Sequence, residues 1–374
     1  MGRLRVLLAL AVLACAFPAQ AGAATSIPDV GSSFWAHSQI VWSVNQGWVP
    51  LRKNGTFASK NPATRAAAAR VLAELNERQT GTPVASSPFQ QAVDAGWIGP
   101  GTGASDSITQ FAFDRGIVRV LGVGSAATKL ATITGADGWR PKLPHGFGVE
   151  QVVRQAGARW NVPFGADKWE TWPGSTLLRA NLAVQAYQLG HLSSYWLYSV
   201  DNQLNVVNAL PKYPPLKKAV LGFAFRWAGA PYIWGGTSDQ PQTLFGLPAA
   251  GGFDCSGFVW WVMKRSYSVP GASWNGSAQI PWRTTYEMAA HIPVSKRIRF
   301  KDLKPGDILF WSTNPNGVLT NSNTVYHTGI YLGNGWTINS HGSGAGVTID
   351  YMGNGAGWYR DAFAFGWRVM PVGV

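Results

Sequence analysis

Cys255 has the residue type and setting of a candidate nucleophile. The chain has 2 cysteines, Cys15 and Cys255. Asp254 is a favourable N-cap residue, and the apolar positions between 258 and 262 follow helical periodicity, so Cys255 is expected to open a helix. Amide groups and the dipole at a helix start stabilise a thiolate. This position favours a reactive thiol over an inert core cysteine.

A cysteine nucleophile needs a base, and the chain contains 6 histidines. Two of them bracket a segment with the pattern of a β-hairpin. Strand-like residues at 327–332 and 336–341 flank a glycine-rich turn at 333–335. The segment could therefore present a histidine close to the cysteine.

The register of this hairpin depends on the length of its turn. With a three-residue turn and Gly335 in the left-handed region, His327 faces His341 and lies diagonal to Asn339 on one face. A two-residue turn would bring Ser340 to that face instead. The first register places a base beside a group that orients it, as Cys-His-Asn catalysis requires.

The elements that must position these side chains follow a clear order along the chain. Helical patterns at 216–227 and 256–267 come first. Strand-like runs follow, at 307–311, 328–332, 336–340 and 365–370. Helices followed by antiparallel strands favour an α+β domain. The prolines at 211, 214 and 215 favour a linker and a domain boundary before it.

Four motifs follow one another in this part of the chain. They are Tyr232-Ile233-Trp234-Gly235-Gly236, Phe253-Asp254-Cys255-Ser256-Gly257, Leu303-Lys304-Pro305-Gly306-Asp307 and the run 327–335 from His327 to Gly335. In this order they resemble the NlpC family of papain-like cell-wall cysteine peptidases. The resemblance covers about residues 216–370 and implies endopeptidase action on peptidoglycan stem peptides, commonly between D-glutamate and the diamino acid. The chain departs from the family in the stretch 237–252, which is longer than usual and could form a loop over the cleft.

The resemblance also implies roles for individual residues. Cys255 would attack the carbonyl, and His327 would accept its proton and later protonate the leaving amine. Asn339 occupies the position of the third catalytic member, with His341 as the alternative. Oxyanion and substrate binding would involve Tyr232, Asp254 and Ser256.

The first half of the chain contains a weak internal repeat. Helical patterns at 38–50 and 64–75 return at 89–100 and 109–121, and a looser copy runs from 148 to 189. Three helix-loop-helix units of this kind predict a small helical array. The first copy, with Pro28-Asp29-Val30, Phe34-Trp35-Ala36 and Thr64-Arg65-Ala66, resembles an S-layer homology repeat, which implies binding to cell-wall polymers. Ala67 replaces the usual acidic residue of that repeat.

The N-terminus favours an exported protein, and the charge favours anionic partners. Arg3 and Arg5 precede an apolar run from 6 to 17 and a small-residue site at 19–21, the pattern of a secretory signal peptide. A lipoprotein modified at Cys15 is the less favoured alternative. The formal charge of +13 would attract anionic polymers of the wall. No phosphate-binding loop and no metal-binding motif is found, so no cofactor, metal or nucleic acid is expected.

Together these patterns predict a signal peptide at 1–21, S-layer-like helical repeats at 27–210 and an α+β papain-like peptidase domain at 211–374. The expected function is a secreted, wall-associated peptidoglycan endopeptidase. The alternatives are an inactive wall-binding protein, or an amidase or acyltransferase on the same scaffold.

Overall fold

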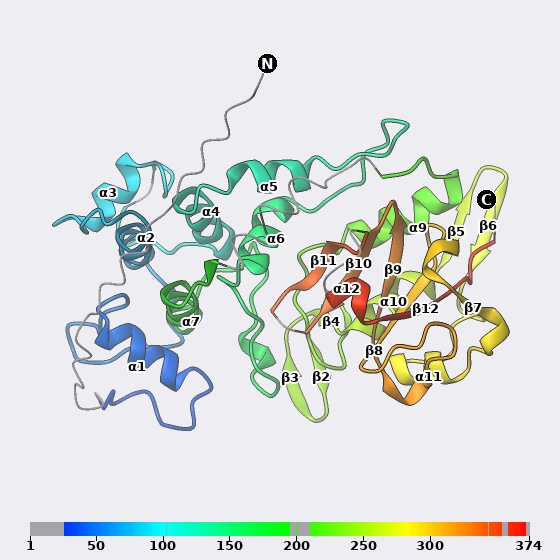
Figure 1. Cartoon of the computed structure of the whole chain (residues 1–374). Coiled ribbons are helices and arrows are strands. Elements are labelled where there is room, and N and C mark those ends of the chain that lie inside the picture. The colour runs from blue at the N-terminus through cyan, green and yellow to red at the C-terminus, as the bar shows by residue number, and fades with distance from the viewer. Residues whose placement is uncertain are drawn as a thin grey trace, which may run out of the picture.

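The chain folds into a helical N-terminal part and a C-terminal part built around an antiparallel sheet (Figure 1). The computed structural model describes residues 26–101, 103–194, 200, 210–342, 344–353 and 358–371. The predicted signal peptide at 1–21, with Cys15, lies outside these residues. Buried apolar side chains of both parts form one continuous core. The predicted combination of a helical region with a mixed helix and sheet domain is confirmed.

Three helices form the centre of the helical part, each preceded by an extended loop. These are α2 (Arg65–Thr80), α4 (Gln110–Val120) and α7 (Arg179–Gly190). Thr64 and Thr109 cap the first two through their side chains, as expected for Thr64. The remaining helical elements are α1 (His37–Asn45), α3 (Pro88–Asp94), α5 (Gly124–Ala131), α6 (Phe147–Gln155) and the short η1 (Asp167–Trp169).

The three loops before these central helices join in a closed ring of backbone hydrogen bonds. The Ala63 amide donates to the Leu177 carbonyl at 2.7 Å, the Leu177 amide to the Ile108 carbonyl at 2.9 Å, and the Ile108 amide to the Ala63 carbonyl at 3.1 Å. Each of the three loops therefore contacts the next loop through an equivalent residue. This arrangement of three equivalent loop-helix units accounts for the repeat in the sequence.

Arginines at the first positions of α2 and α7 have structural partners. Arg65 donates to the Gly99 carbonyl, and its guanidinium lies over the ring of Phe89. Arg179 donates to the carbonyls of Phe57 and Pro50, at 2.6 and 2.7 Å. Both arginines are buried, so they tie each helix to a neighbouring loop.

The C-terminal part contains a six-stranded sheet with the order β11-β10-β9-β8-β12-β7, in which all neighbours are antiparallel. Helix α10 (Cys255–Met263) packs against β9 and β10, and α11 (Thr285–Ala290) packs against β9. Helix α9 (Pro215–Phe225) precedes them, and α12 (Trp358–Asp361) precedes the last strand. The strands are β7 (Arg297–Ile298), β8 (Ile308–Ser312), β9 (Val325–Gly333), β10 (Trp336–His341), β11 (Gly346–Tyr351) and β12 (Phe363–Trp367).

Short hairpins and 3-10 turns complete this part. The long stretch at 237–252 forms two nested strand pairs, and the tip residue Phe245 packs edge-on against Phe164 of the helical part, with ring centroids 5.8 Å apart. The pairs are β1 (Thr237–Ser238) with β4 (Gly252–Phe253), β2 (Gln242–Leu244) with β3 (Leu247–Ala249), and β5 (Ser266–Val269) with β6 (Ala272–Asn275); the turns are η2 (Val294–Lys296), η3 (Phe300–Asp302) and η4 (Ser322–Thr324).

Helix α6 lies beside the outer strand β11 of the sheet (Figure 1). The side-chain amide of Gln151 accepts a hydrogen bond from the Ile349 amide at 3.1 Å and donates to the Ile349 carbonyl. Arg154 donates to the Gly344 carbonyl at 2.7 Å. The helical part thus covers a strand edge that would otherwise expose backbone groups.

The proline-rich segment before α9 is packed. The Leu210 amide donates to the Thr134 carbonyl, and the buried Tyr213 hydroxyl donates to the Leu332 carbonyl of β9. The segment therefore ties the helical part to the sheet. Among the described residues, no helix combines the length and the apolar character needed to span a bilayer.

Candidate active site

Cys255 is the first residue of α10, as the sequence predicts. The Asp254 side chain caps the helix by accepting a hydrogen bond from the Gly257 amide, and it also accepts one from the Ser256 hydroxyl. The Cys255 Sγ lies 3.3 Å from the Thr285 Oγ1 at the start of α11, and the Thr328 backbone lies close enough to lower the pKa of the thiol. The sulfur therefore lies beside the residue that directly follows His327.

Burial opposes the thiolate that the helix start favours at Cys255. Burial, followed by the negative charge of Asp254, raises the pKa of the Cys255 thiol to about 11, and the hydrogen bond from Thr285 offsets only part of this rise. The residue is 8% exposed. Removal of the thiolate from water therefore acts against the stabilisation by the helix start.

His327 lies in β9, and its Nε2 is 2.8 Å from the Oδ1 of Asn339 in β10. This contact leaves Nδ1 as the ring nitrogen that could exchange a proton with Cys255. Burial, with a smaller contribution from His341, lowers the pKa of His327 to about 3. The imidazole is therefore neutral in the resting site and can accept a proton.

The hairpin has the strand pairing that brings His327 and Asn339 together, but a bulge and not the turn length produces this pairing. Gly333 pairs with Trp336, so the turn has two residues, Asn334 and Gly335, with φ of 51° and 83°. The register then shifts, and Thr337 pairs with Tyr331. One extra residue in β9 thus restores the pairing that a three-residue turn would give. The turn thus has the length of the second alternative, while the pairing beyond it is that of the first.

His341, the alternative third member, also lies beside His327. The ring centroids of the two histidines are 5.1 Å apart, and the His341 ring is 4.9 Å from that of Trp358. Burial lowers the pKa of His341, which keeps its ring neutral near the base. The structure thus pairs Asn339 with Nε2 and places His341 as an aromatic neighbour.

Tyr232 also lies near Cys255. Burial, followed by the charge of Cys255, raises the pKa of the Tyr232 hydroxyl, so the hydroxyl stays protonated and can donate a hydrogen bond. The Tyr232 amide donates to the Oδ1 of Asn161 at 3.3 Å. The Asn161 Nδ2 donates to the carbonyls of His341 and Gly342, at 3.5 and 3.4 Å. The helical part therefore contacts two segments of the site.

Arg283 and Thr285 are site residues that the sequence patterns did not indicate. The Arg283 guanidinium donates to both carboxylate oxygens of Asp254, at 3.1 and 3.0 Å, and to the Ser256 hydroxyl at 2.8 Å. It also donates to the Gly235 carbonyl at 3.0 Å. Arg283 therefore holds the helix start against the turn that follows Tyr232. Arg283 lies in an irregular segment before the short helix α11, so hydrophobic periodicity could not indicate it.

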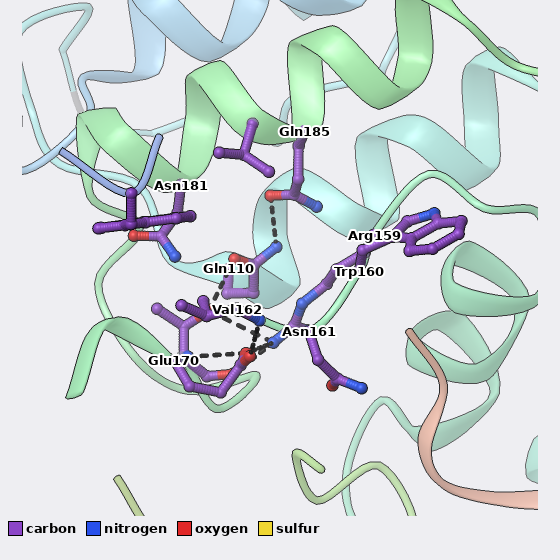
Figure 2. A pocket seen from close by; sticks show the side chains of 11 residues that line it. Gln110, Arg159, Trp160, Asn161, Val162, Glu170, Asn181 and Gln185 are labelled. Carbon is purple, nitrogen blue, oxygen red and sulfur yellow. Dashed lines mark hydrogen bonds and ion pairs between the residues drawn. The ribbon is translucent and has the colours of Figure 1, made fainter. Parts of the chain in front are cut away.

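A second polar region lies within the helical part (Figure 2). A cavity of about 20 Å³ is lined by Gln110, Arg159, Glu170 and Asn181, among others. This volume corresponds to about one water molecule. Burial alone would raise the pKa of the neighbouring Glu150, but the charges of Arg159 and Arg154 lower that pKa. The cluster is a buried ion network that holds α4, α6 and α7 together.

A larger groove lies between the segment 95–100 and helix α4. It has a volume of about 580 Å³, and Arg115 and Arg119 line it. Within the part of the chain that the structure describes, no group of three or more His, Cys, Asp or Glu side chains could hold a metal ion.

Comparisons with known proteins place residues 229–366 in the NlpC/P60 family. The bifunctional muramidase/DL-endopeptidase CwlT of Bacillus subtilis is 30% identical over 186 residues, which cover 48% of this chain and 46% of the relative. The murein DD-endopeptidase MepH of Escherichia coli is 33% identical over 132 residues, 35% of this chain and 39% of the relative. The chain thus spans less than half the length of these two relatives.

Solved structures include other members of the family. The NlpC/p60 domain of the peptidoglycan hydrolase SagA is 26% identical, covers 41% of this chain and 98% of its own, and has a TM-score of 0.27. RipD of Mycobacterium tuberculosis, described as a non-catalytic NlpC/p60 domain protein, is 17% identical, covers 42% of this chain and all of its own, and has a TM-score of 0.29. On the sequence match, residues 229–366 form a domain of the NlpC/P60 family.

Proposed function

We propose that this protein is a peptidoglycan endopeptidase that cleaves stem-peptide amide bonds by a Cys-His-Asn mechanism. The observation that carries the proposal is the packing of α10, which begins at the buried Cys255, against strand β9, in which the Nε2 of His327 is held by Asn339. The endopeptidase names of its relatives support the same class of reaction. A nucleophile on a helix that packs against a sheet carrying the base is also the papain-like arrangement that we assign to this domain.

The reaction starts from a neutral thiol and a neutral imidazole. As the Cys255 sulfur attacks the carbonyl carbon, its proton passes to His327, and the carbonyl oxygen becomes negative. The Tyr232 hydroxyl and the Cys255 amide donate hydrogen bonds to that oxygen. His327 then gives the proton to the leaving amine, and the carbon–nitrogen bond breaks. Water, deprotonated by His327, hydrolyses the thioester, and the proton returns to the sulfur.

We place the cleaved bond between D-glutamate and the diamino acid. The family resemblance of the four motifs supports this choice, and one relative is named gamma-D-glutamyl-L-lysine dipeptidyl-peptidase, from Bacillus subtilis, with 29% identity over 122 residues. The decisive experiment digests purified sacculi and determines the released muropeptides by mass spectrometry. New D-glutamate carboxyl ends on the products are the expected result.

The same digest distinguishes the alternatives. Cleavage next to the sugar would identify an amidase, and a new amide with an added amine would identify an acyltransferase. If the wild-type protein releases no more muropeptides than Cys255→Ala does, the protein is a wall-binding protein without turnover. Release by wild type and none by Cys255→Ala is the result expected here.

We further propose that the helical part holds the enzyme at the cell wall through anionic polymers, and that the protein is secreted. The groove beside Arg115 and Arg119 supports this proposal, because two guanidinium groups flank a hollow large enough for a sugar phosphate or carboxylate. Co-sedimentation with sacculi before and after acid extraction of the polymers tests it. Arg115→Gln with Arg119→Gln should abolish the difference between the two preparations, and equal binding to both preparations by the wild type would contradict it.

A further inference from the structure

Asn339 connects His327 to a second buried polar group. Its Oδ1 lies 2.8 Å from the His327 Nε2, and its Nδ2 donates to the Oδ2 of Asp350 at 3.0 Å. Asp350 lies in β11, the strand next to Asn339, and neither side chain is more than 5% exposed. The amide therefore has one end on the base and the other on a carboxylate.

Two hydroxyl groups complete the surroundings of the Asp350 carboxylate. The Thr348 hydroxyl donates to Oδ2 at 2.7 Å, and the Tyr359 hydroxyl donates to the same oxygen at 3.0 Å. Tyr359 also lies 3.3 Å from the Asn339 Oδ1. Burial, followed by the charge of Asp350, raises the pKa of the Tyr359 hydroxyl, so it remains a donor. Asn339, Thr348 and Tyr359 thus each supply a hydrogen to the same carboxylate oxygen.

The carboxylate decides which way the Asn339 amide points. A carboxylate only accepts hydrogen bonds, whereas an amide has a donor end and an acceptor end. A flipped Asn339 would place its oxygen 3.0 Å from the Asp350 oxygen, in a buried site where two facing acceptors are costly. The orientation with NH2 toward Asp350 therefore leaves only the acceptor oxygen for His327.

We propose that Asp350 is a positioning residue that sets the tautomer of His327 through Asn339. An acceptor at Nε2 requires the hydrogen on Nε2, which leaves the lone pair on Nδ1 to take the Cys255 proton. Without Asp350 the amide can turn its NH2 to the ring, and the hydrogen then moves to Nδ1. That tautomer cannot accept a proton from the thiol. This proposal rests on the proposed peptidase function.

The test removes the acceptor at 350 and then supplies an acceptor at 339. Asp350→Leu should lower kcat at least tenfold with little change in KM, because nothing then fixes the Asn339 amide and part of the population holds the wrong tautomer. The double variant Asn339→Asp with Asp350→Leu should recover most of that loss, because an aspartate at 339 offers an acceptor to Nε2 in either orientation. Thr348→Val is the matched control: it removes a donor to Asp350 but leaves the acceptor facing Asn339, so kcat should fall less than threefold.

A tautomer measurement makes the result independent of turnover. Nitrogen NMR of the imidazoles, with the His327 signals identified by their loss in His327→Gln, should show hydrogen on Nε2 in the wild-type protein and a mixture in Asp350→Leu. Hydrogen on Nδ1 in the wild type would overturn the proposal. Wild-type kcat in Asp350→Leu, or a double variant no better than the single one, would also overturn it. If no sacculi are cleaved by the wild type, the peptidase proposal fails, while the NMR result still decides the role of Asp350.

Discussion

The Oδ1 of Asn161, in the helical part, accepts a hydrogen bond from the backbone amide of Tyr232, in the NlpC/P60 domain, at 3.3 Å. The other end of the same amide reaches the carbonyl of Gly342, which follows strand β10. A residue of the predicted wall-binding region thus holds two segments of the candidate active site in place. The helical part supports the catalytic domain structurally, in addition to any role as an anchor.

Gln151 provides the clearest test of that support. Gln151→Leu leaves both backbone groups of Ile349 in the buried edge strand without their side-chain partner. Each buried polar group without a partner costs about 1–3 kcal/mol, so the free energy of unfolding should fall by about that amount or more. Urea unfolding followed by tryptophan fluorescence measures it. Gln46→Leu, at an exposed position, is the control, and an equal change in both variants would contradict the prediction.

The thiol of Cys255 should be slow to react at neutral pH. Burial raises its pKa to about 11, so the thiolate fraction should rise about tenfold per pH unit between pH 7 and pH 10. The rate of alkylation by iodoacetamide in the absence of substrate, followed by mass spectrometry of the Cys255 peptide, should rise in parallel. A rate that is already constant above pH 7 would mean that the resting site holds a thiolate.

Loss of Arg283 should loosen the start of α10. Arg283→Met keeps the length of the side chain but removes its hydrogen bonds to Asp254, Ser256 and Gly235. Because the guanidinium is partly exposed, the loss in unfolding free energy should be about 1–2 kcal/mol. The rate of muropeptide release should fall more than the stability implies, since the helix start positions Cys255. Arg78→Met, at an exposed position in α2, should change neither quantity.

Acidification should destabilise the fold through its buried histidines. Burial lowers the pKa of His327 to about 3, whereas an unfolded histidine titrates near 6.5, so between these values the unfolded chain binds more protons. The stability is therefore complete above pH 6.5 and falls as the pH drops, by up to about 1.4 kcal/mol per unit for this group. Unfolding midpoints between pH 7 and pH 4 should show a smaller decline in His327→Gln. An unchanged slope in His327→Gln, or an equal reduction in His191→Gln, which alters an exposed histidine, would contradict this prediction.

Much of the site could be predicted because its elements are encoded locally. The cap at Asp254, the helix that begins at Cys255 and the strands around the Asn334-Gly335 turn follow from short-range periodicity and turn chemistry. The same signals indicated the central helices α2 and α4. Strand β11 was not predicted, although it carries Asp350 and its residues from Val347 to Tyr351 alternate between apolar and polar types.

By itself, the sequence determined which residue types stand at the helix start and along the hairpin, since N-caps and strand alternation act over a few residues. Only the tertiary structure decided that Asn339 contacts His327, that Arg283 joins Asp254 from another segment, and that burial raises the pKa of the Cys255 thiol. These outcomes depend on which distant segments exclude water from the site and which bulge sets the pairing. Burial and register are properties of the packed chain, so local patterns do not contain them.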